Sequence, residues 1–357
     1  MEKKVKLMVG PTEIPMRVLN AMGREVITHR SKEYMEIHRN INQSLKELFN
    51  TKNDVIILTT SGTGAMETAI QNCFSKGDEV VVPIIGHFSE RFATISEIYG
   101  LVVKRVMFEA GDSADVELIM ESISPSTKGL LVVHNESSTG VFNNLEEIGK
   151  AIKDKDILFI VDSVSGIGGL EFKMDEWNID IALTASQKSL MSPPGLALMG
   201  VSDKAYEAME KSQFPKYYFD LRKARKSSES NQTPWTPSIY SMFAMEEALK
   251  MINEEGLSSV YNRHLTNRDI LIDGLEKLGF ELFAKDKKYA SPTLTTIKTK
   301  INSKIYVDEL KKHGFIIAGG IEPYAENTLR IGTMGYVSTN DIVAFLEAFS
   351  KIVKEME

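Results

Sequence analysis

The chain has 357 residues, of which 43% are hydrophobic and 25% are charged, and its formal net charge is −7. These values are typical of a soluble globular protein, and the length allows two ordinary domains or one large domain with a smaller companion. The acidic balance argues against a general binder of nucleic acids or anionic membranes, so small molecules are the expected partners.

The first residues, 1–4, lead directly into a strand-like segment without an apolar signal region, and no uncharged apolar run approaches about 18 residues. We therefore expect a cytoplasmic protein without a membrane span. The single cysteine, Cys73, excludes an intrachain disulfide framework, and its helical context favours a buried thiol over a nucleophile. The six histidines form no close cluster with carboxylates, so no metal site is predicted.

Apolar runs alternate with helical patterns through the first part of the chain. The runs that read as strands are 55–60, 79–84, 101–108, 129–134, 157–162 and 180–184. This alternation predicts an α/β fold with a mainly parallel sheet. A seventh run, 196–201, follows the sixth too closely for a helical crossover, so we expect an antiparallel seventh strand.

The remaining chain predicts a second, smaller α/β domain. Two long helical patterns are followed by shorter elements, in the order 238–253, 258–278, 293–298, 307–313, 328–331 and 340–353. No repeat or low-complexity tract interrupts the chain. We predict a large domain over 16–250 and a small domain over 251–357, with the segment 1–15 packing back against the small domain.

A glycine-containing turn, 60–64, follows the first strand and precedes the helical pattern 65–74. A strand–turn–helix connection presents free backbone amides to an anion, and the hydroxyls of Ser61 and Thr63 can add hydrogen bonds. The turn lacks the lysine and the glycine spacing of nucleotide-binding loops, which favours a simple phosphate group. An ordinary turn in which Thr63 caps the helix is the alternative.

Two charged residues follow predicted buried strands. Asp162 ends the run 157–161, and catalytic groups of open parallel sheets gather at such strand ends, although Asp162 could also cap the following turn. Lys188 follows the sixth strand and precedes Pro193-Pro194-Gly195, so it should project from a constrained loop. A lysine in a partly dry pocket can become a neutral amine that forms a Schiff base with an aldehyde, whereas a solvated surface lysine is the plain alternative.

Five segments, in order along nearly the whole chain, resemble class V pyridoxal-phosphate (PLP) aminotransferases, specifically the alanine–glyoxylate and serine–pyruvate group. They are 9–12 (VGPT), 61–63 (SGT), 136–140 (ESSTG), 161–164 (VDSV) and 186–189 (SQKS). The resemblance implies a fold type I PLP enzyme in which Lys188 carries the cofactor as a Schiff base and Asp162 faces its ring nitrogen. It also implies that Ser61, Gly62 and Thr63 bind the phosphate.

The same resemblance assigns the other site residues. Phe88 would stack on the cofactor ring, although it could be a core phenylalanine. Ser137 would contact the cofactor, and Gln187 would bond its ring hydroxyl oxygen, although 137–140 is also ordinary turn chemistry. Arg330 would clamp the substrate carboxylate, with a structural ion pair as the alternative.

The resemblance further implies a homodimer with shared sites, in which the polar loop 223–236 crosses to the partner and Thr233 reaches the partner's phosphate. Ser230 stands where some members carry tyrosine. A solvated loop is the alternative. The Ser61 turn contains no cationic residue that could neutralise the phosphate, which also favours a contribution from the partner.

The activity implied is ping-pong transamination from alanine or serine to glyoxylate or pyruvate. Aspartate, phosphonate or ureido substrates are alternatives within the class. A cysteine desulfurase is disfavoured because Cys73 lies in the wrong element. A non-covalent phosphate-ligand-binding protein is the alternative from a different class.

Overall fold

The computed structural model describes residues 4–356, and its largest element is a seven-stranded sheet in the order β2–β10–β9–β8–β5–β3–β4. The strands are β2 (Asp54–Leu58), β3 (Glu79–Ile84), β4 (Val102–Met107), β5 (Thr127–Val133), β8 (Leu158–Asp162), β9 (Ile181–Ala185) and β10 (Ala197–Val201). β10 is antiparallel to both of its neighbours, and the other pairs are parallel. The predicted sheet and its antiparallel seventh strand are confirmed.

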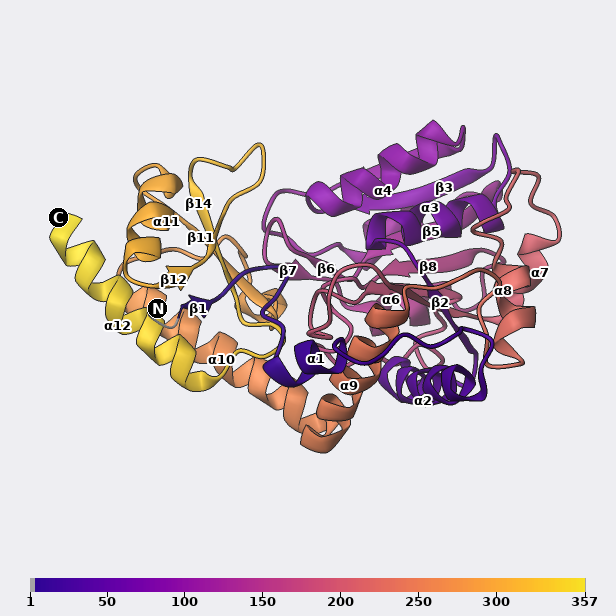
Figure 1. The fold of residues 1–357 in the computed structure, drawn as a ribbon. Coiled ribbons are helices and arrows are strands. Elements are labelled where there is room, and N and C mark those ends of the chain that lie inside the picture. The colour runs from indigo at the N-terminus through magenta and orange to yellow at the C-terminus, as the bar shows by residue number, and fades with distance from the viewer. Residues whose placement is uncertain (1–3, 357) are drawn as a thin grey trace.

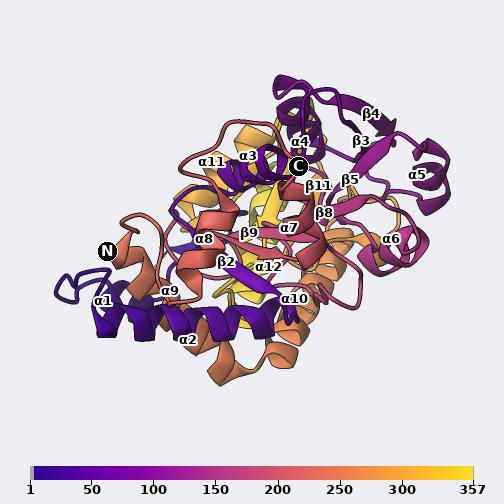
Figure 2. The same cartoon turned by 90° about the vertical axis from the view of Figure 1, so that its right-hand side faces the viewer.

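The main sheet is buried on both faces because successive side chains of each strand enter opposite cores. In β8, Phe159 and Val161 belong to one core, whereas Leu158 and Ile160 belong to the other. Helices cover the sheet on both sides (Figures 1 and 2). The first core includes α2 (Lys32–Phe49), α5 (Val116–Ser122), α6 (Leu145–Ile152) and α9 (Ile239–Glu255); the second includes α3 (Gly62–Cys73), α4 (His87–Ile98), α7 (Asp203–Met209) and α8 (Leu221–Ser228).

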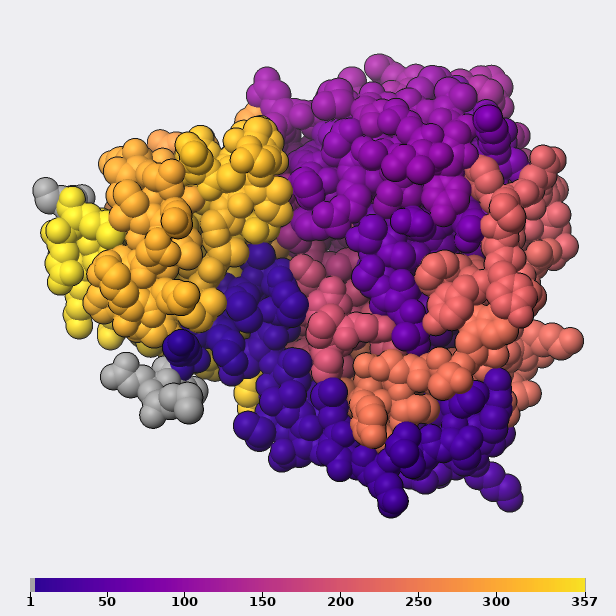
Figure 3. Space-filling view, turned by 45° about the horizontal axis from the view of Figure 1, so that its top comes forward, coloured from indigo at the N-terminus to yellow at the C-terminus, as the bar shows by residue number. Residues whose placement is uncertain are grey.

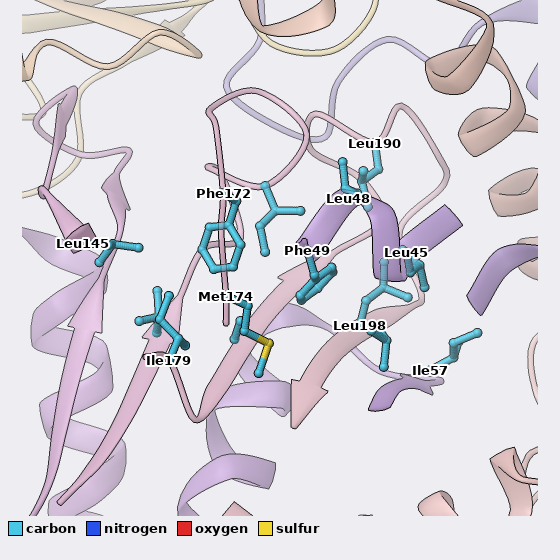
Figure 4. Packing of buried hydrophobic residues seen from close by; sticks show 14 of the residues in the cluster. Leu45, Leu48, Phe49, Ile57, Leu145, Phe172, Met174, Ile179, Leu190 and Leu198 are labelled. Atoms are coloured by element: carbon cyan, nitrogen blue, oxygen red, sulfur yellow. The ribbon is translucent and has the colours of Figure 1, made fainter. Parts of the chain in front are cut away.

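Figure 4 shows the close packing of the first core. Phe49 at the end of α2 meets Phe172 edge to face, with ring centroids 6.1 Å apart, and Met174 and Leu198 belong to the same core. This packing anchors the sheet from which the loops at its strand ends project.

A second α/β unit lies beside the main sheet (Figure 1). Its elements are α10 (Leu257–Lys277), β11 (Leu294–Lys298), α11 (Ser303–Lys312), β12 (Phe315–Ile316), β13 (Ala318–Gly319), β14 (Thr328–Gly332) and α12 (Thr339–Met356). The strands β11, β14 and β13 form a sheet in that order. Short elements elsewhere are α1 (Met16–Ala21), β6 (Asn135–Glu136), β7 (Val141–Phe142) and a 3₁₀ turn at Lys287–Tyr289.

The N-terminal segment joins this second unit. β1 (Val5–Lys6) pairs in parallel with β12, and Leu7 is fully buried in the core that contains Phe345 and Phe349. In the space-filling view, the indigo N-terminal segment adjoins the orange and yellow unit (Figure 3). We propose the division into 1–15, 16–250 and 251–357, because the second α/β unit has a hydrophobic core of its own. Helix α10 connects the two units, since its Val260 packs in the first core of the main sheet and its Leu271 packs in the core of the second unit.

Two local predictions are wrong. Helix α3 begins at Gly62 rather than at Ala65, because the Ser61 side chain accepts a hydrogen bond from the Gly64 amide and caps the helix earlier. The predicted loop 223–236 begins inside α8, where the Asp220 carboxylate accepts from the first amides of the helix. No helix within residues 4–356 is both long and apolar enough to cross a membrane.

Candidate active site

The carboxyl ends of the six parallel strands lie along one edge of the main sheet, and five of these strands carry the predicted site segments. β2, β3, β5, β8 and β9 run in the same direction, so the residues that follow them lie along this edge. Open α/β sheets bind their ligands at this edge. The predicted segments around Ser61, Phe88, Ser137, Asp162 and Lys188 all follow or end one of these strands.

Lys188 lies in the loop between β9 and β10, and its Nζ donates a hydrogen bond to the Val9 carbonyl at 2.6 Å. The pKa of this lysine is lowered to about 8, mainly by burial and also by the nearby Arg330, whereas Asp162 opposes the shift. Gly10 leaves space for the amine, since a Cβ at this position would lie 2.5 Å from Nζ. Lys188 is therefore a half-buried amine rather than a solvated surface lysine.

Asp162 ends β8 and is only 3% exposed. One carboxylate oxygen accepts the Val164 amide at 2.8 Å, which is the predicted turn cap, and no donor within residues 4–356 bonds the other oxygen. The pKa of Asp162 is raised to about 7, mainly by burial and also by the carboxylate of Glu136, whereas the Val164 amide and Lys188 oppose the shift. Among residues 4–356, no cation bonds this buried carboxylate directly, so its charge is left for a ligand to balance.

The turn before α3 has the features of an anion site. The Ser61 hydroxyl accepts the Gly64 amide at 3.2 Å, so Ser61 and not Thr63 caps the helix. The amides of Gly62 and Thr63 belong to the first helical turn and have no intrahelical acceptor. Glycine at position 62 also lets Val164 pack closely against the backbone of this turn, because a Cβ at position 62 would lie 2.7 Å from a methyl group of Val164. The geometry suits a phosphate held by backbone amides.

Arg91 lies beside this turn, and it was not among the site residues predicted from the sequence. Its guanidinium donates to the Thr63 hydroxyl at 3.2 Å, contacts His87 Nε2 at 3.1 Å and stacks over the Phe88 ring at 4.7 Å. Arg91 follows Phe88 by three residues and His87 by four in α4, and this helical spacing was the available signal. The turn itself holds no cationic residue, as expected, and Arg91 comes to it from a neighbouring helix.

Phe88 lies in the first turn of α4, half-buried, with its ring edge to face on His87 at 5.3 Å between centroids. It belongs to none of the hydrophobic cores formed by the described residues, so it is not a core phenylalanine. One face of its ring is taken by Arg91.

Glu136 is fully buried behind Phe88. Its carboxylate accepts hydrogen bonds from the Phe88 amide at 3.0 Å, the Ser89 amide at 3.0 Å and the Ser138 hydroxyl at 2.6 Å. The positive end of α4 stabilises this negative charge. Sequence reasoning assigned Glu136 no role, because glutamate is rarely buried and nothing in the local pattern marks it as such.

Arg330 and Ser137 meet across the two units. Arg330 is 8% exposed in β14, and it donates to the Gly319 carbonyl at 2.8 Å and to the Ser137 carbonyl at 3.2 Å. Burial lowers the pKa of Arg330 to about 10. No carboxylate within residues 4–356 forms an ion pair with it, so the alternative of a structural ion pair finds no partner there. The Ser137 hydroxyl donates to Ser165 at 2.8 Å.

The side chains of Gln187 and Thr233 form no hydrogen bond, within residues 4–356, to the other predicted site residues. The Gln187 carbonyl accepts the Thr12 amide at 3.0 Å, while its side chain makes no hydrogen bond among the described residues. Thr233 donates to the Trp235 carbonyl at 2.8 Å, and its own carbonyl accepts from Arg30. No hydrogen bond within 4–356 joins Thr233 to the Ser61 turn of its own chain.

Other reactive groups lie apart from this edge. Cys73 is free and buried in α3, as predicted, and burial raises the pKa of its thiol. Within the part of the chain that the structure describes, no three His, Cys, Asp or Glu side chains are grouped so that they could hold a metal ion.

Comparisons with known proteins agree with this geometry. Residues 8–345 match the family described as "Aminotransferase class-V". An uncharacterized aminotransferase of Methanocaldococcus jannaschii is 39% identical over 99% of this chain and 94% of its own length. The serine–glyoxylate aminotransferase of Methylorubrum extorquens is 33% identical over 91% of this chain and 85% of its own. The crystal structure of the ureidoglycine–glyoxylate aminotransferase of Bacillus subtilis superposes with a TM-score of 0.94 at 30% identity, covering 99% of this chain and 94% of that one.

Proposed function

This chain belongs to the class V aminotransferases, and we propose that it moves the amino group of alanine or serine to glyoxylate or pyruvate with PLP as its cofactor. Family membership favours an enzyme over a non-covalent phosphate-ligand-binding protein. The observation that carries the proposal is the pair of a half-buried amine, Lys188, and a buried carboxylate, Asp162, at the ends of adjacent strands. Glyoxylate as acceptor is supported by the names of two relatives.

The residues present fit PLP, the cofactor of this enzyme family. The first-turn amides of Gly62 and Thr63 would hold the phosphate, Asp162 would face the ring nitrogen, and Phe88 would stack on the ring. When bound, PLP supplies an aldehyde that accepts an amino group and a cationic ring that withdraws electrons from the α-carbon. Asp162 would keep the ring nitrogen protonated, because its own charge is otherwise without a cationic partner.

The chain's own groups would bind the substrate and move its proton. Arg330 would take the α-carboxylate through two parallel hydrogen bonds, which orients the Cα–H bond. Lys188 Nζ would remove the α-proton, since an amine with a pKa near 8 is partly neutral close to neutral pH. The Val9 carbonyl, which accepts a hydrogen bond from Nζ, would hold the free amine in place. A second oxo acid would reverse these steps, giving ping-pong kinetics.

We further propose that the active unit is a homodimer with shared sites, in which Thr233 binds the partner's phosphate. Thr233 makes no hydrogen bond to the Ser61 turn of its own chain within the described residues. Tyr217 and Tyr218 are 68% and 44% exposed, and both stack on Trp235, two residues after Thr233, with ring centroids 4.8 and 6.3 Å apart. Exposed apolar side chains that gather in this way mark interfaces. Two-fold contacts are the commonest arrangement of symmetric oligomers.

The test combines the visible absorption of the purified protein, borohydride trapping and an activity matrix. Donors would be alanine, serine, aspartate, a phosphonate and a ureido amino acid, and acceptors would be glyoxylate and pyruvate. The ureido donor belongs in the matrix because the Bacillus subtilis relative is named for such a substrate. We expect the highest activity with alanine or serine, and a protein without a visible band would contradict the proposal.

Lys188→Ala should abolish both transamination and the adduct that borohydride traps, because the segment 184–189 holds no other lysine that could substitute for it. The matched control is Lys150→Ala, which removes a 69% exposed lysine paired with Glu146 and should keep both properties. A trapped adduct and full turnover in Lys188→Ala would remove this lysine from the mechanism.

A further inference from the structure

Arg91 is a half-buried cation without a carboxylate partner. None of the ion pairs within residues 4–356 includes it. Its neighbour Glu90 is already bound by Arg105 at 2.9 Å, and Glu97 on the same helix also pairs with Arg105. The three contacts of Arg91 are instead to a hydroxyl, an imidazole nitrogen and an aromatic face. These contacts fix its position but leave its charge uncompensated.

Arg91 lies at the N-terminus of α3, where a second positive charge is already present. Its guanidinium bonds Thr63, the second residue of α3, where the unpaired amides place about half a positive charge. Two positive groups side by side repel each other, and an anion between them would be stabilised by both. The guanidinium also contacts His87 Nε2, and this contact brings no negative group to balance its charge.

We propose that Arg91 binds the phosphate of PLP from within the same chain and supplies the positive charge that the Ser61 turn lacks. The inference rests on the proposed function and extends it to a residue outside the recognised motifs. The phosphate carries nearly two negative charges at neutral pH, whereas Ser61, Gly62, Thr63 and the partner's threonine would offer only neutral donors. Arg91 also lies against the Phe88 ring, so one side chain would join the phosphate site to the stacking site.

The experiment separates a phosphate contact from a general effect on the site. Apoenzyme would be titrated with pyridoxamine 5′-phosphate and with pyridoxamine, which differ only in the phosphate and form no Schiff base with Lys188. In Arg91→Gln, we expect the dissociation constant of the phosphorylated ligand to rise about tenfold or more, which is the range for hydrogen bonds to charged groups. The dissociation constant of pyridoxamine should change less than about twofold. Arg91→Lys, which keeps the charge, should recover part of the affinity.

Two control variants define the alternatives. Arg105→Gln removes an arginine that also contacts α4 but lies in β4 and is paired with carboxylates, so both dissociation constants should stay at their wild-type values. Phe88→Leu removes the stacking ring and should weaken both ligands alike. Inorganic phosphate provides an independent probe, and it should compete with pyridoxamine 5′-phosphate at lower concentrations on wild-type apoenzyme than on Arg91→Gln.

Equal losses for both ligands in Arg91→Gln, or no loss for either, would overturn the inference while leaving the proposed function intact. A wild-type protein that binds neither pyridoxamine compound and has no visible band would overturn both. Thermal unfolding of each variant identifies losses of affinity that come from misfolding. If Arg91→Gln misfolds, the titration of Arg91→Lys with the two pyridoxamine compounds and with phosphate as competitor decides the outcome.

Discussion

The carboxylate of Asp162 should make the apoprotein less stable as the pH rises, and Asp162→Asn should remove this effect. The folded protein raises the pKa of Asp162 from its ordinary value of 3.8 to about 7 through burial. Between these two pH values the folded chain binds a proton that the unfolded chain has released, so raising the pH removes stability, and the loss is complete above about pH 7. At 1.36 kcal/mol per pKa unit, the full effect is on the order of 4 kcal/mol.

The measurement is the free energy of unfolding of apo wild type and apo Asp162→Asn at pH 5 and pH 8. Other titrating groups contribute equally to both proteins and cancel in the difference. We expect the stability of the variant relative to wild type to increase by about 3 kcal/mol between the two pH values. The asparagine keeps an oxygen for the Val164 amide, so the turn should survive.

The matched control is Asp269→Asn, which alters a 61% exposed carboxylate beside Arg268 and should give the same difference at both pH values. Asp162→Asn should at the same time bind PLP more weakly and turn over orders of magnitude more slowly, because the ring nitrogen loses its anionic partner. If the stability of Asp162→Asn relative to wild type does not change with pH, then burial does not raise the pKa of Asp162 in the apoprotein.

Two further predictions concern the substrate and the partner subunit. Arg330→Lys should raise KM for both the amino donor and the oxo acid, because a point charge cannot reproduce a two-bond clamp; an unchanged KM for the acceptor would indicate a structural role. Thr233→Ala should raise the PLP dissociation constant several-fold, corresponding to about 1 kcal/mol for one neutral hydrogen bond. In mixed dimers with Lys188→Ala, the one intact site should regain wild-type affinity, whereas retention of the Thr233→Ala affinity, or a fully active monomer, would refute shared sites.

The main sheet was predictable because its strands are buried on both faces. Runs such as 157–161 are apolar throughout, and turns or helical patterns separate them. The same logic located Asp162 and Lys188, since polar residues that end or follow buried strands lie at the edge where open α/β sheets bind their ligands. The start of α3 was not predictable in this way, because Gly62, Thr63 and Gly64 are poor helix formers and only the cap at Ser61 fixes the boundary.

The positions of Arg91 and Glu136 could not be predicted from local sequence patterns. Both act through contacts between elements: Arg91 reaches from α4 to α3, and Glu136 reaches from β6 to the first turn of α4. Charged residues at such positions read as solvated surface when only their sequence neighbours are considered. The spacing of Arg91 relative to Phe88 is visible in the sequence, but its lack of a carboxylate partner is a property of the folded chain alone.

The N-terminal segment sets the order in which this protein can be completed during synthesis. Val5 pairs with Phe315, and Thr12 bonds the backbone of Gln187 and Lys188, so residues that leave the ribosome early must wait for partners that leave much later. The main sheet can form before those last partners exist, because domains fold as units as the chain emerges. The Val9 carbonyl that holds the lysine amine lies between these two anchors. Assembly of the surroundings of Lys188 is therefore expected to be a late step, after the small unit has been made.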